Sequence, residues 1–186
     1  ARESLKTGKE LVKAEKSMQN LLEDSVNRTN TKIWVMLCDI LMKQYEQGNE
    51  KLYLKQQYDT AAFFSVTKRM YETMAKFDSI DAHLNMPSPV LPKYRERHAQ
   101  FLNSIRPNLF NGGTYFLHVK DYKTAYDYFD NYIKTDKQSL FIGYDYEHKD
   151  DLMPHAAYWA MYCGYKLGDT EKTMRYLNLA ERDSSM

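Results

Sequence analysis

Five histidines are the residues of this chain with the broadest chemistry, because imidazole binds metals and exchanges protons near neutral pH. They are His83, His98, His118, His148 and His155. No two of them form an HxxxH or HExxH motif. A zinc site would need His148 and His155 to be joined by Asp150 or Asp151 through a loop. The alternative is that these are solvated loop residues, and it requires no such coincidence.

The two cysteines are the next candidates for reactive side chains. Cys38 and Cys163 are 125 positions apart, so they form no CxxC motif. Cys38 lies between Leu37 and Leu41 in an apolar helical pattern, where a thiol behaves as a small hydrophobic group. We expect both cysteines to be buried free thiols that form no disulfide with each other.

Two clusters of charged residues are further candidates for binding sites. The acidic cluster consists of Asp145, Glu147, Asp150 and Asp151. It lacks the alternation, the glycine and the final glutamate of an EF-hand, which favours a solvated loop over a calcium site. The basic cluster consists of Lys93, Arg95, Arg97 and Arg106, beside Tyr94. It suits phosphate or RNA binding, or it is a solvated helix start.

The overall charge decides between these last two interpretations. The chain has 26 Lys and Arg against 25 Asp and Glu, a net charge of +1. Such a balance gives no general attraction to nucleic acid or to an anionic membrane. We therefore expect no nucleic-acid partner. We also expect no catalytic residue, no cofactor and no metal site.

The composition indicates which elements must position any functional side chain. The 186 residues include 7 Gly and 5 Pro, too few for a fold of many short strands and turns. No apolar run approaches the ~18 residues of a membrane span. Apolar residues instead recur at steps of three and four, which predicts amphipathic helices. The expected fold class is therefore all-α, with no membrane span in this chain.

The periodicity predicts that the whole chain forms one array of helices. An N-terminal helix is expected over 4–24, followed by three helix pairs over 31–79, 93–135 and 152–182. Gly48-Asn49 weakens the first pair, and Pro107 should kink or split the second. Pro87, Pro89 and Pro92 place a loop at 80–92, and an irregular aromatic segment covers 136–150. The last helix is expected over 170–182.

Turn residues mark several of the helix ends. Asp59 and Asp169 are expected N-caps, since a carboxylate there accepts a hydrogen bond from the first turn. Lys120-Asp121 is a further turn, and Gly168 suits the left-handed position after a helix. Pro154 suits a first helical turn. These short turns make consecutive helices antiparallel neighbours.

An internal spacing recurs in the second pair. Leu109 is followed by Gly112-Gly113 and Phe116, and Ala125 by Phe129. The nine positions from Phe116 to Ala125 match the spacing of W-x2-L-G-x2-Y followed by A-x3-F. These residues resemble the tetratricopeptide repeat (TPR). The third pair repeats the pattern less completely, with Gly164 where the family has Tyr, and Thr173 and Leu177 in its second helix.

The first pair departs furthest from the repeat. A register on Trp34 and Leu37 puts Glu50 at the small-residue position, whereas a register on Tyr45 and Gly48 restores Ala61 but leaves Ser65 in place of Phe. The resemblance covers about residues 30–182. It is closest to the TPR-like proteins of Bacteroidetes that carry export signals, through the stretches 43–53 and 158–167. That likeness implies a periplasmic or exported protein, with a cytoplasmic location as the alternative.

The resemblance implies a fold and a function. Stacked antiparallel pairs form a right-handed αα-superhelix, whose first helices line a concave face. The residues that the register places on this face are Thr114, Leu117, His118, Tyr158, Tyr162, Tyr165 and Lys166. Tyrosines favour interfaces because they bring large area at low entropic cost. The alternative is that they pack against the next repeat.

We therefore expect a non-enzymatic module that binds a protein or peptide segment or acts as a scaffold. Packing against further repeats and self-association stay open as other partner interactions. One alternative is an accessory or sensor domain of a larger signalling protein or enzyme, with the active domain outside this fragment. Another is a purely structural piece of a longer solenoid.

Overall fold

The computed structural model describes residues 1–84 and 91–182, and every regular element within them is helical. The expectation of an all-α fold is thus confirmed. The longer helices are α2 (Leu11–Glu23), α3 (Thr31–Tyr53), α4 (Thr60–Leu84), α5 (Arg95–Ile105), α6 (Pro107–His118), α7 (Tyr122–Lys134) and α9 (Leu152–Lys166). The shorter ones are α1 (Arg2–Thr7), η1 (Thr135–Lys137), η2 (Ser139–Phe141), α8 (Tyr146–Lys149), α10 (Thr170–Met174) and α11 (Leu177–Ala180).

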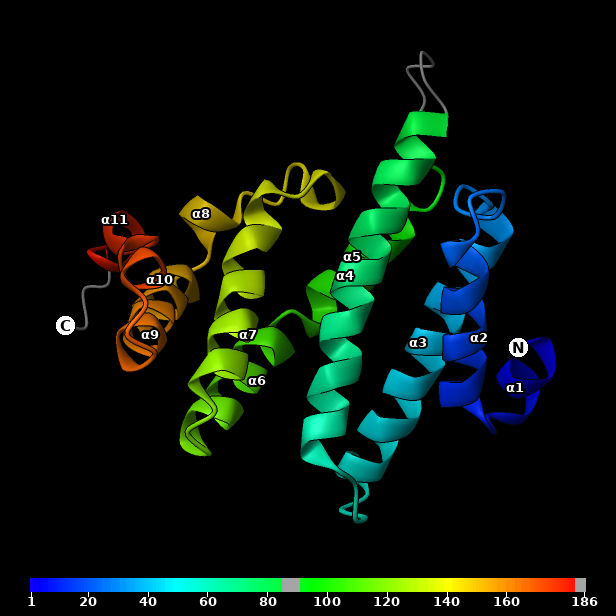
Figure 1. Ribbon diagram of the computed structural model, residues 1–186, viewed down its shortest axis with the longest axis horizontal. Coiled ribbons are helices and arrows are strands. Elements are labelled where there is room, and N and C mark those ends of the chain that lie inside the picture. Colours follow the sequence, from blue (N-terminus) through cyan, green and yellow to red (C-terminus); the bar gives the residue numbers. More distant parts are fainter. Residues whose placement is uncertain (85–90, 183–186) are drawn as a thin grey trace. The chain divides into compact units, whose positions relative to one another are not determined.

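The chain forms two compact units, an N-terminal unit of residues 1–100 and a C-terminal unit of residues 101–186. Helix α5 spans the boundary between them in the sequence. In the N-terminal unit, α3 packs between α2 and α4 (Figure 1). Leu11 and Ala14 of α2 are buried against Ile40 of α3. This contact follows from the apolar residues that recur at helical steps along α2.

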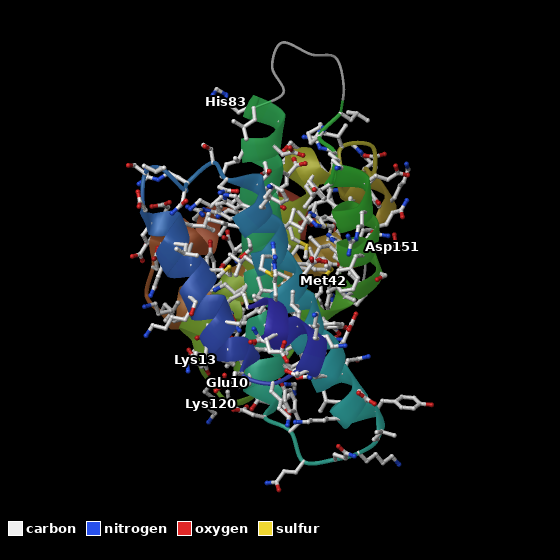
Figure 2. All side chains as sticks on the ribbon, turned by 90° about the vertical axis from the view of Figure 1, so that its right-hand side faces the viewer. Glu10, Lys13, Met42, His83, Lys120 and Asp151 are labelled. Atoms are coloured by element: carbon white, nitrogen blue, oxygen red, sulfur yellow. The ribbon has the colours of Figure 1, made fainter. Side chains whose placement is uncertain are left out.

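The helix expected over 4–24 is divided into α1 and α2. Gly8 takes a left-handed conformation with φ 68°, which ends α1 as a glycine readily can. Glu10 is also left-handed, and α2 begins directly after it. Figure 2 shows Glu10 and Lys13 at this start, where their charged groups are 3.9 Å apart. The apolar periodicity begins at Leu11, so it carries no information about the break before it.

Helix α4 runs to Leu84, past the residue at which the loop is predicted to begin. The predicted start of the loop at residue 80 is therefore wrong, since α4 is helical through Leu84. Buried Asp78 accepts two hydrogen bonds from Arg95, each 2.8 Å long. Asp81 is buried within the same helix. The prolines at 87 and 89 lie outside the described residues. Helix α3, by contrast, continues without interruption through Gly48-Asn49.

A buried carboxylate links the three main helices of the N-terminal unit. Glu15 of α2 is 4% exposed and accepts a 2.7 Å hydrogen bond from Arg69 Nε of α4. Gln44 of α3 donates to its other oxygen at 2.8 Å. Burying this charge is tolerable because both carboxylate oxygens have partners.

The C-terminal unit is built around α7, which packs against both α6 and α9 (Figure 1). Pro107 separates α5 from α6, as predicted, and it stands in the first turn of α6. The side chain of Asp121 accepts a hydrogen bond from Thr124 N and caps α7. Gly113 lies so close to Phe129 that a Cβ there would be 2.7 Å from the ring. Gly113 therefore lies at a close crossing of α6 and α7, where a side chain would not fit without a shift of Phe129.

The end of the C-terminal unit is more segmented than expected. Gly168 is left-handed and Asp169 accepts a hydrogen bond from Lys172 N, so both predicted turn residues are confirmed. The single helix expected over 170–182 is instead divided into α10 and α11. The irregular segment 136–150 contains the short turns η1, η2 and α8.

Candidate functional site

A pocket of about 360 Å³ brings three predicted site residues together in the C-terminal unit. Thr114, Leu117 and His118 come from the last two turns of α6. Three further residues complete the lining, namely Phe110 of α6 with His155 and Trp159 of α9. We call this pocket the α6–α9 groove. Its volume falls in the range typical of ligand pockets, ~300–1,000 Å³.

Each wall of the α6–α9 groove is one stripe of a helix. On α6 the stripe consists of Phe110, Thr114 and Leu117, and side chains at steps of three and four share a helix face. On α9 the same steps connect His155 to Trp159. The ring centres of Phe110 and His155 are 6.1 Å apart, so the two walls meet at this point.

The α9 stripe continues outside the pocket through Tyr162 and Lys166. The ring of Trp159 packs edge-on against both Tyr158, at 5.0 Å, and Tyr162, at 5.7 Å. Lys166 Nζ lies 5.3 Å from the centre of the Tyr162 ring, a cation–π contact. These ring contacts connect Tyr158, Tyr162 and Lys166 to the groove. Tyr165 is 70% exposed and does not line it.

Phe110, His155 and Trp159 are the groove residues that the repeat register misses. A signal for them exists, because Phe110 precedes Thr114 by four residues and Trp159 precedes Tyr162 by three. Extending each predicted stripe by one turn toward the helix start would have included Phe110 and His155, whereas Trp159 lies directly beside the predicted Tyr158. The register itself assigns no role to these positions.

The polar groups of the groove make hydrogen bonds within α6. Thr114 Oγ1 donates to the carbonyl of Phe110 at 3.2 Å. His118 Nδ1 lies 2.7 Å from the carbonyl of Thr114. A carbonyl oxygen can only accept, so Nδ1 must carry the hydrogen. In the neutral ring, Nε2 is consequently the acceptor that His118 offers to a ligand.

Local structure holds α9 in place. Its last turn closes with hydrogen bonds from Gly168 N to the carbonyl of Tyr165 and from Asp169 N to the carbonyl of Gly164. A Cβ on Gly164 would lie 2.6 Å from the backbone nitrogen of Thr173. The absence of a side chain at Gly164 therefore permits α10 to approach α9 directly.

The predicted metal alternative is not assembled. His148 Nδ1 is 2.6 Å from Asp145, whereas His155 lies in the groove. Asp150 forms an ion pair with Arg106. Among residues 1–84 and 91–182, no group of three or more His, Cys, Asp or Glu could hold a metal ion.

The basic cluster is dispersed among structural contacts. Arg95 is paired with Asp78, and Arg97 lies 3.6 Å from Asp39. Arg106 is buried, which corrects its assignment to an exposed cationic patch. The sequence pattern cannot reveal this because the partners of these arginines lie far along the chain.

Both cysteines are buried and free, as predicted. Burial, together with a smaller effect of the nearby Asp39 charge, raises the pKa of Cys38 to about 12. Burial also raises the pKa of Cys163 to about 12. Since the thiolate is the nucleophile, neither side chain is set up for thiol chemistry at neutral pH.

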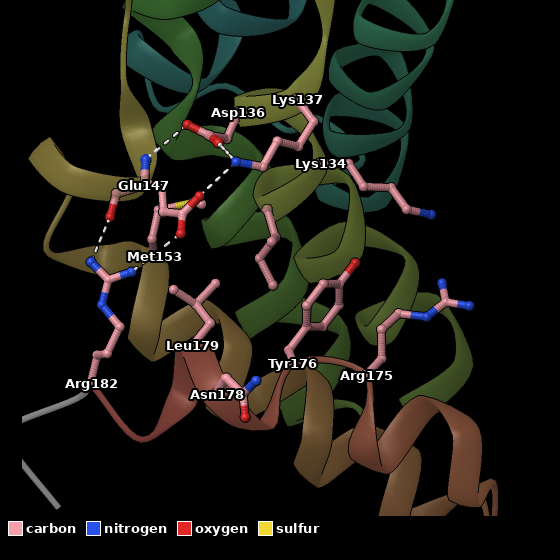
Figure 3. A pocket seen from close by; sticks show the side chains of 11 residues that line it. Lys134, Asp136, Lys137, Glu147, Met153, Arg175, Tyr176, Asn178, Leu179 and Arg182 are labelled. Carbon is pink, nitrogen blue, oxygen red and sulfur yellow. Dashed lines mark hydrogen bonds and ion pairs between the residues drawn. The ribbon is translucent and has the colours of Figure 1, made fainter.

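A second pocket, of about 420 Å³, lies between the end of α7 and α11 (Figure 3). Its apolar floor includes Ile133, Met153 and Leu179. The cations at its rim already have carboxylate partners within the protein. The pairs are Lys134 with Asp130, Lys137 with Asp136 and Glu147, Arg175 with Glu171, and Arg182 with Glu147. The α6–α9 groove, with its open aromatic wall, is the better candidate site.

Two further findings bear on the class of protein. Within the described part of the chain, no helix combines the length and the apolar character that crossing a membrane requires. Comparison with protein-family models, curated proteins and solved structures finds no match to this chain.

Proposed function

We propose that this chain is a non-enzymatic module that binds a peptide segment of a partner protein in the α6–α9 groove. The observation that carries the proposal is the lining of the groove, in which aromatic side chains from two separate helices surround an open pocket. The pocket suits one large apolar side chain of an extended segment. Aromatic anchors in such pockets supply much of the affinity of protein interfaces.

The rim of the groove supplies groups that orient a bound backbone. His118 Nε2 accepts a hydrogen bond from a peptide N–H when the ring is neutral. Lys166, next to Tyr162, attracts a carbonyl or carboxylate oxygen. Because this recognition combines one cation with apolar area, we expect binding to depend only moderately on salt.

We further propose that the helix pairs follow the TPR-like superhelical arrangement. In the third pair, the register aligns Gly164 with Phe116 and Thr173 with Ala125. The close approach of Gly164 to Thr173 supports this register. In the second pair, Phe116 stacks on Tyr128 at 5.3 Å, next to Phe129. In this arrangement α6 and α9 are both first helices, and their shared groove is on the concave face.

The test begins with peptides selected on the wild-type protein from a random display library. Thr114→Arg places a long side chain in the groove, whereas Asn111→Arg places one on an exposed position of the same helix. We expect Thr114→Arg to weaken the selected peptides by about tenfold or more, and Asn111→Arg to leave affinity unchanged. A folded Tyr158→Ala/Tyr162→Ala variant should also bind more weakly.

Equal affinities for wild type, Thr114→Arg and the double tyrosine variant would contradict the proposal. The tyrosines would then be better explained as packing residues. Fluorine NMR with 5-fluorotryptophan adds an internal control, because the chain has two tryptophans. Binding should move the Trp159 resonance and leave that of Trp34, a residue of the N-terminal unit, in place.

A further inference from the structure

The C-terminal unit contains a buried guanidinium whose contacts are all within the unit. Arg106, just before α6, is 5% exposed. Its Nε donates to Thr135 Oγ1 at 2.9 Å, and one terminal nitrogen donates to the carbonyl of Tyr132 at 3.2 Å. The other terminal nitrogen forms an ion pair with Asp150. Each nitrogen of the guanidinium therefore has an acceptor.

Aromatic rings hold the plane of this guanidinium. Its Cζ lies 3.8 Å from the ring centre of Tyr132 and 3.8 Å from that of Tyr146. Tyr132 also donates its hydroxyl to Asp150 at 2.6 Å, and Tyr146 donates to Asn103 at 2.7 Å. Arg106 thus connects α6 with the end of α7, with α8 and with Asp150, which follows α8 and lies two residues before α9.

The position of this network relates it to the groove. Arg106 lies four residues before Phe110, and Asp150 lies five residues before His155. Tyr132 packs edge-on against Phe110 with ring centres 5.8 Å apart. The network consequently lies beneath the first turns of both helices that form the groove walls.

Stability alone is a weak reason to bury this ion pair. Removing two charges from water is costly, and an apolar replacement often serves the fold as well. A buried guanidinium also fixes the positions of its partners, because its planar hydrogen-bond donors and its two stacking faces each require a partner in a defined place. A lysine would keep the charge but would lose the stacking and most of these directions.

We propose that Arg106 is a positioning residue that holds the starts of α6 and α9 at the separation that forms the α6–α9 groove. Its contribution to ligand binding rests on the proposed function, but the positioning can be measured without a ligand. Trp159 is the reporter, since it lines the groove one turn beyond His155. A role in global stability alone would leave the Trp159 environment unchanged while the protein stays folded.

The experiment compares wild type, Arg106→Lys and Asp150→Asn, each labelled with 5-fluorotryptophan and confirmed to be helical by circular dichroism. We expect the Trp159 fluorine resonance to shift or to split into two signals in both variants. The Trp34 resonance should stay in place. If Arg106→Lys fails to fold, Asp150→Asn provides the measurement, because it preserves the size of the side chain and removes only its charge.

Arg95→Lys is the matched control, because it weakens a comparable arginine–carboxylate pair with Asp78 in the N-terminal unit. It should lower the melting temperature and leave the Trp159 resonance unchanged. An unchanged Trp159 resonance in a folded Arg106→Lys or Asp150→Asn variant would overturn the proposal, whatever happens to thermal stability. Selected peptides should also bind Arg106→Lys and Asp150→Asn about tenfold more weakly than they bind the wild type.

The two proposals can fail separately. If no peptide binds the wild type in the groove, the proposed function fails, but the Trp159 resonance still decides the role of Arg106. If peptides bind and the resonance does not respond to the variants, the positioning role fails alone.

Discussion

The two units use glycine differently where helices meet. In the C-terminal unit, Gly164 faces the backbone of Thr173 and Gly113 faces the fully buried ring of Phe129. In the N-terminal unit, Gly48 faces the ring of Tyr58, which is partly exposed. A backbone segment cannot move aside and a buried ring can shift only at a cost in packing, whereas a ring at the surface can rotate into solvent. The same residue type is thus essential to packing in one unit and replaceable in the other.

Buried charge shows a parallel difference. The N-terminal unit buries the acid Glu15, and the partner Arg69 reaches it from a position that is partly open to water. The C-terminal unit buries the base Arg106 beneath two tyrosine rings. The first arrangement joins three long helices along their length. The second acts near the start of α6 and the end of α7, where an error in position would change the groove.

The largest effect in this comparison is expected at Gly164. Gly164→Ala places a methyl group 2.6 Å from Thr173 N, which forces α9 and α10 apart. We expect a loss of about 3 kcal/mol or more in the free energy of unfolding, because overpacking a rigid contact costs more than alanine's helical preference returns. Urea denaturation, followed by hydrogen exchange of the C-terminal unit, measures this loss.

Gly113→Ala and Gly48→Ala are the graded controls for this measurement. Gly113→Ala should cost about 1–3 kcal/mol, since the Phe129 ring must shift within the core. Gly48→Ala should be neutral or stabilising by up to ~1 kcal/mol, because Tyr58 can yield and alanine is the better helix former. Equal losses at all three positions would refute the distinction between the units.

A pH effect of similar size is expected in the N-terminal unit. Burial, together with a smaller effect of the Arg97 charge, lowers the pKa of His98 from 6.5 to about 4. Between these pH values the unfolded chain therefore binds more protons at this residue than the folded chain does. The His98 contribution is fully present above pH 6.5 and is lost as the pH falls to 4, by on the order of 3 kcal/mol.

His98→Gln should remove this part of the pH dependence, because the amide does not titrate. His83→Gln is the control, since His83 is exposed near the end of α4 (Figure 2). The measurement is the free energy of unfolding of the N-terminal unit at pH 7 and at pH 4. A His98→Gln profile that parallels the wild-type profile would exclude His98 as the titrating group.

A smaller effect tests how far the repeat register extends. Ala125 is completely buried at the start of α7, whereas Ala61, at the corresponding place in α4, is half-buried. Ala125→Leu should cost about 1–3 kcal/mol by overpacking. Ala61→Leu should cost less than that. Thermal melting of the two variants compares them, and an unchanged melting temperature for Ala125→Leu would count against the register.

The sequence predicts the helices well where local signals are strong. Asp59, Pro107, Asp121 and Gly168 all mark helix ends that the structure confirms. The sequence-based prediction is wrong at the end of α4. Helix α4 continues past its expected end at residue 79 to Leu84, and this extension buries Asp81, which the local pattern does not indicate.

The candidate site likewise contains residues that the sequence predicts and residues that it does not. Periodicity places Thr114, Leu117 and His118 on one face of α6, and the pocket confirms that they lie together. Periodicity cannot say which face of α9 meets that stripe, because this depends on how far each helix is rotated about its axis. Trp159 was missed for this reason, and the predicted residues Tyr158, Tyr162, Tyr165 and Lys166 lie outside the pocket lining. Arg106 was misread because burial of a charge requires distant partners.

The smallest expected effects are those of two helix caps. Asp59 accepts a hydrogen bond from Ala62 N at 3.1 Å in the N-terminal unit, and Asp121 accepts one from Thr124 N at the same distance in the C-terminal unit. Replacing either with alanine should cost about 1 kcal/mol, because a helical N–H loses its partner. Asparagine at either site should restore most of that loss, since its side-chain oxygen also accepts. Unlike the glycines, the caps depend on local geometry alone, so the two units should respond equally. Urea denaturation of the four variants measures this, and a loss confined to one unit would show that its cap also takes part in tertiary packing.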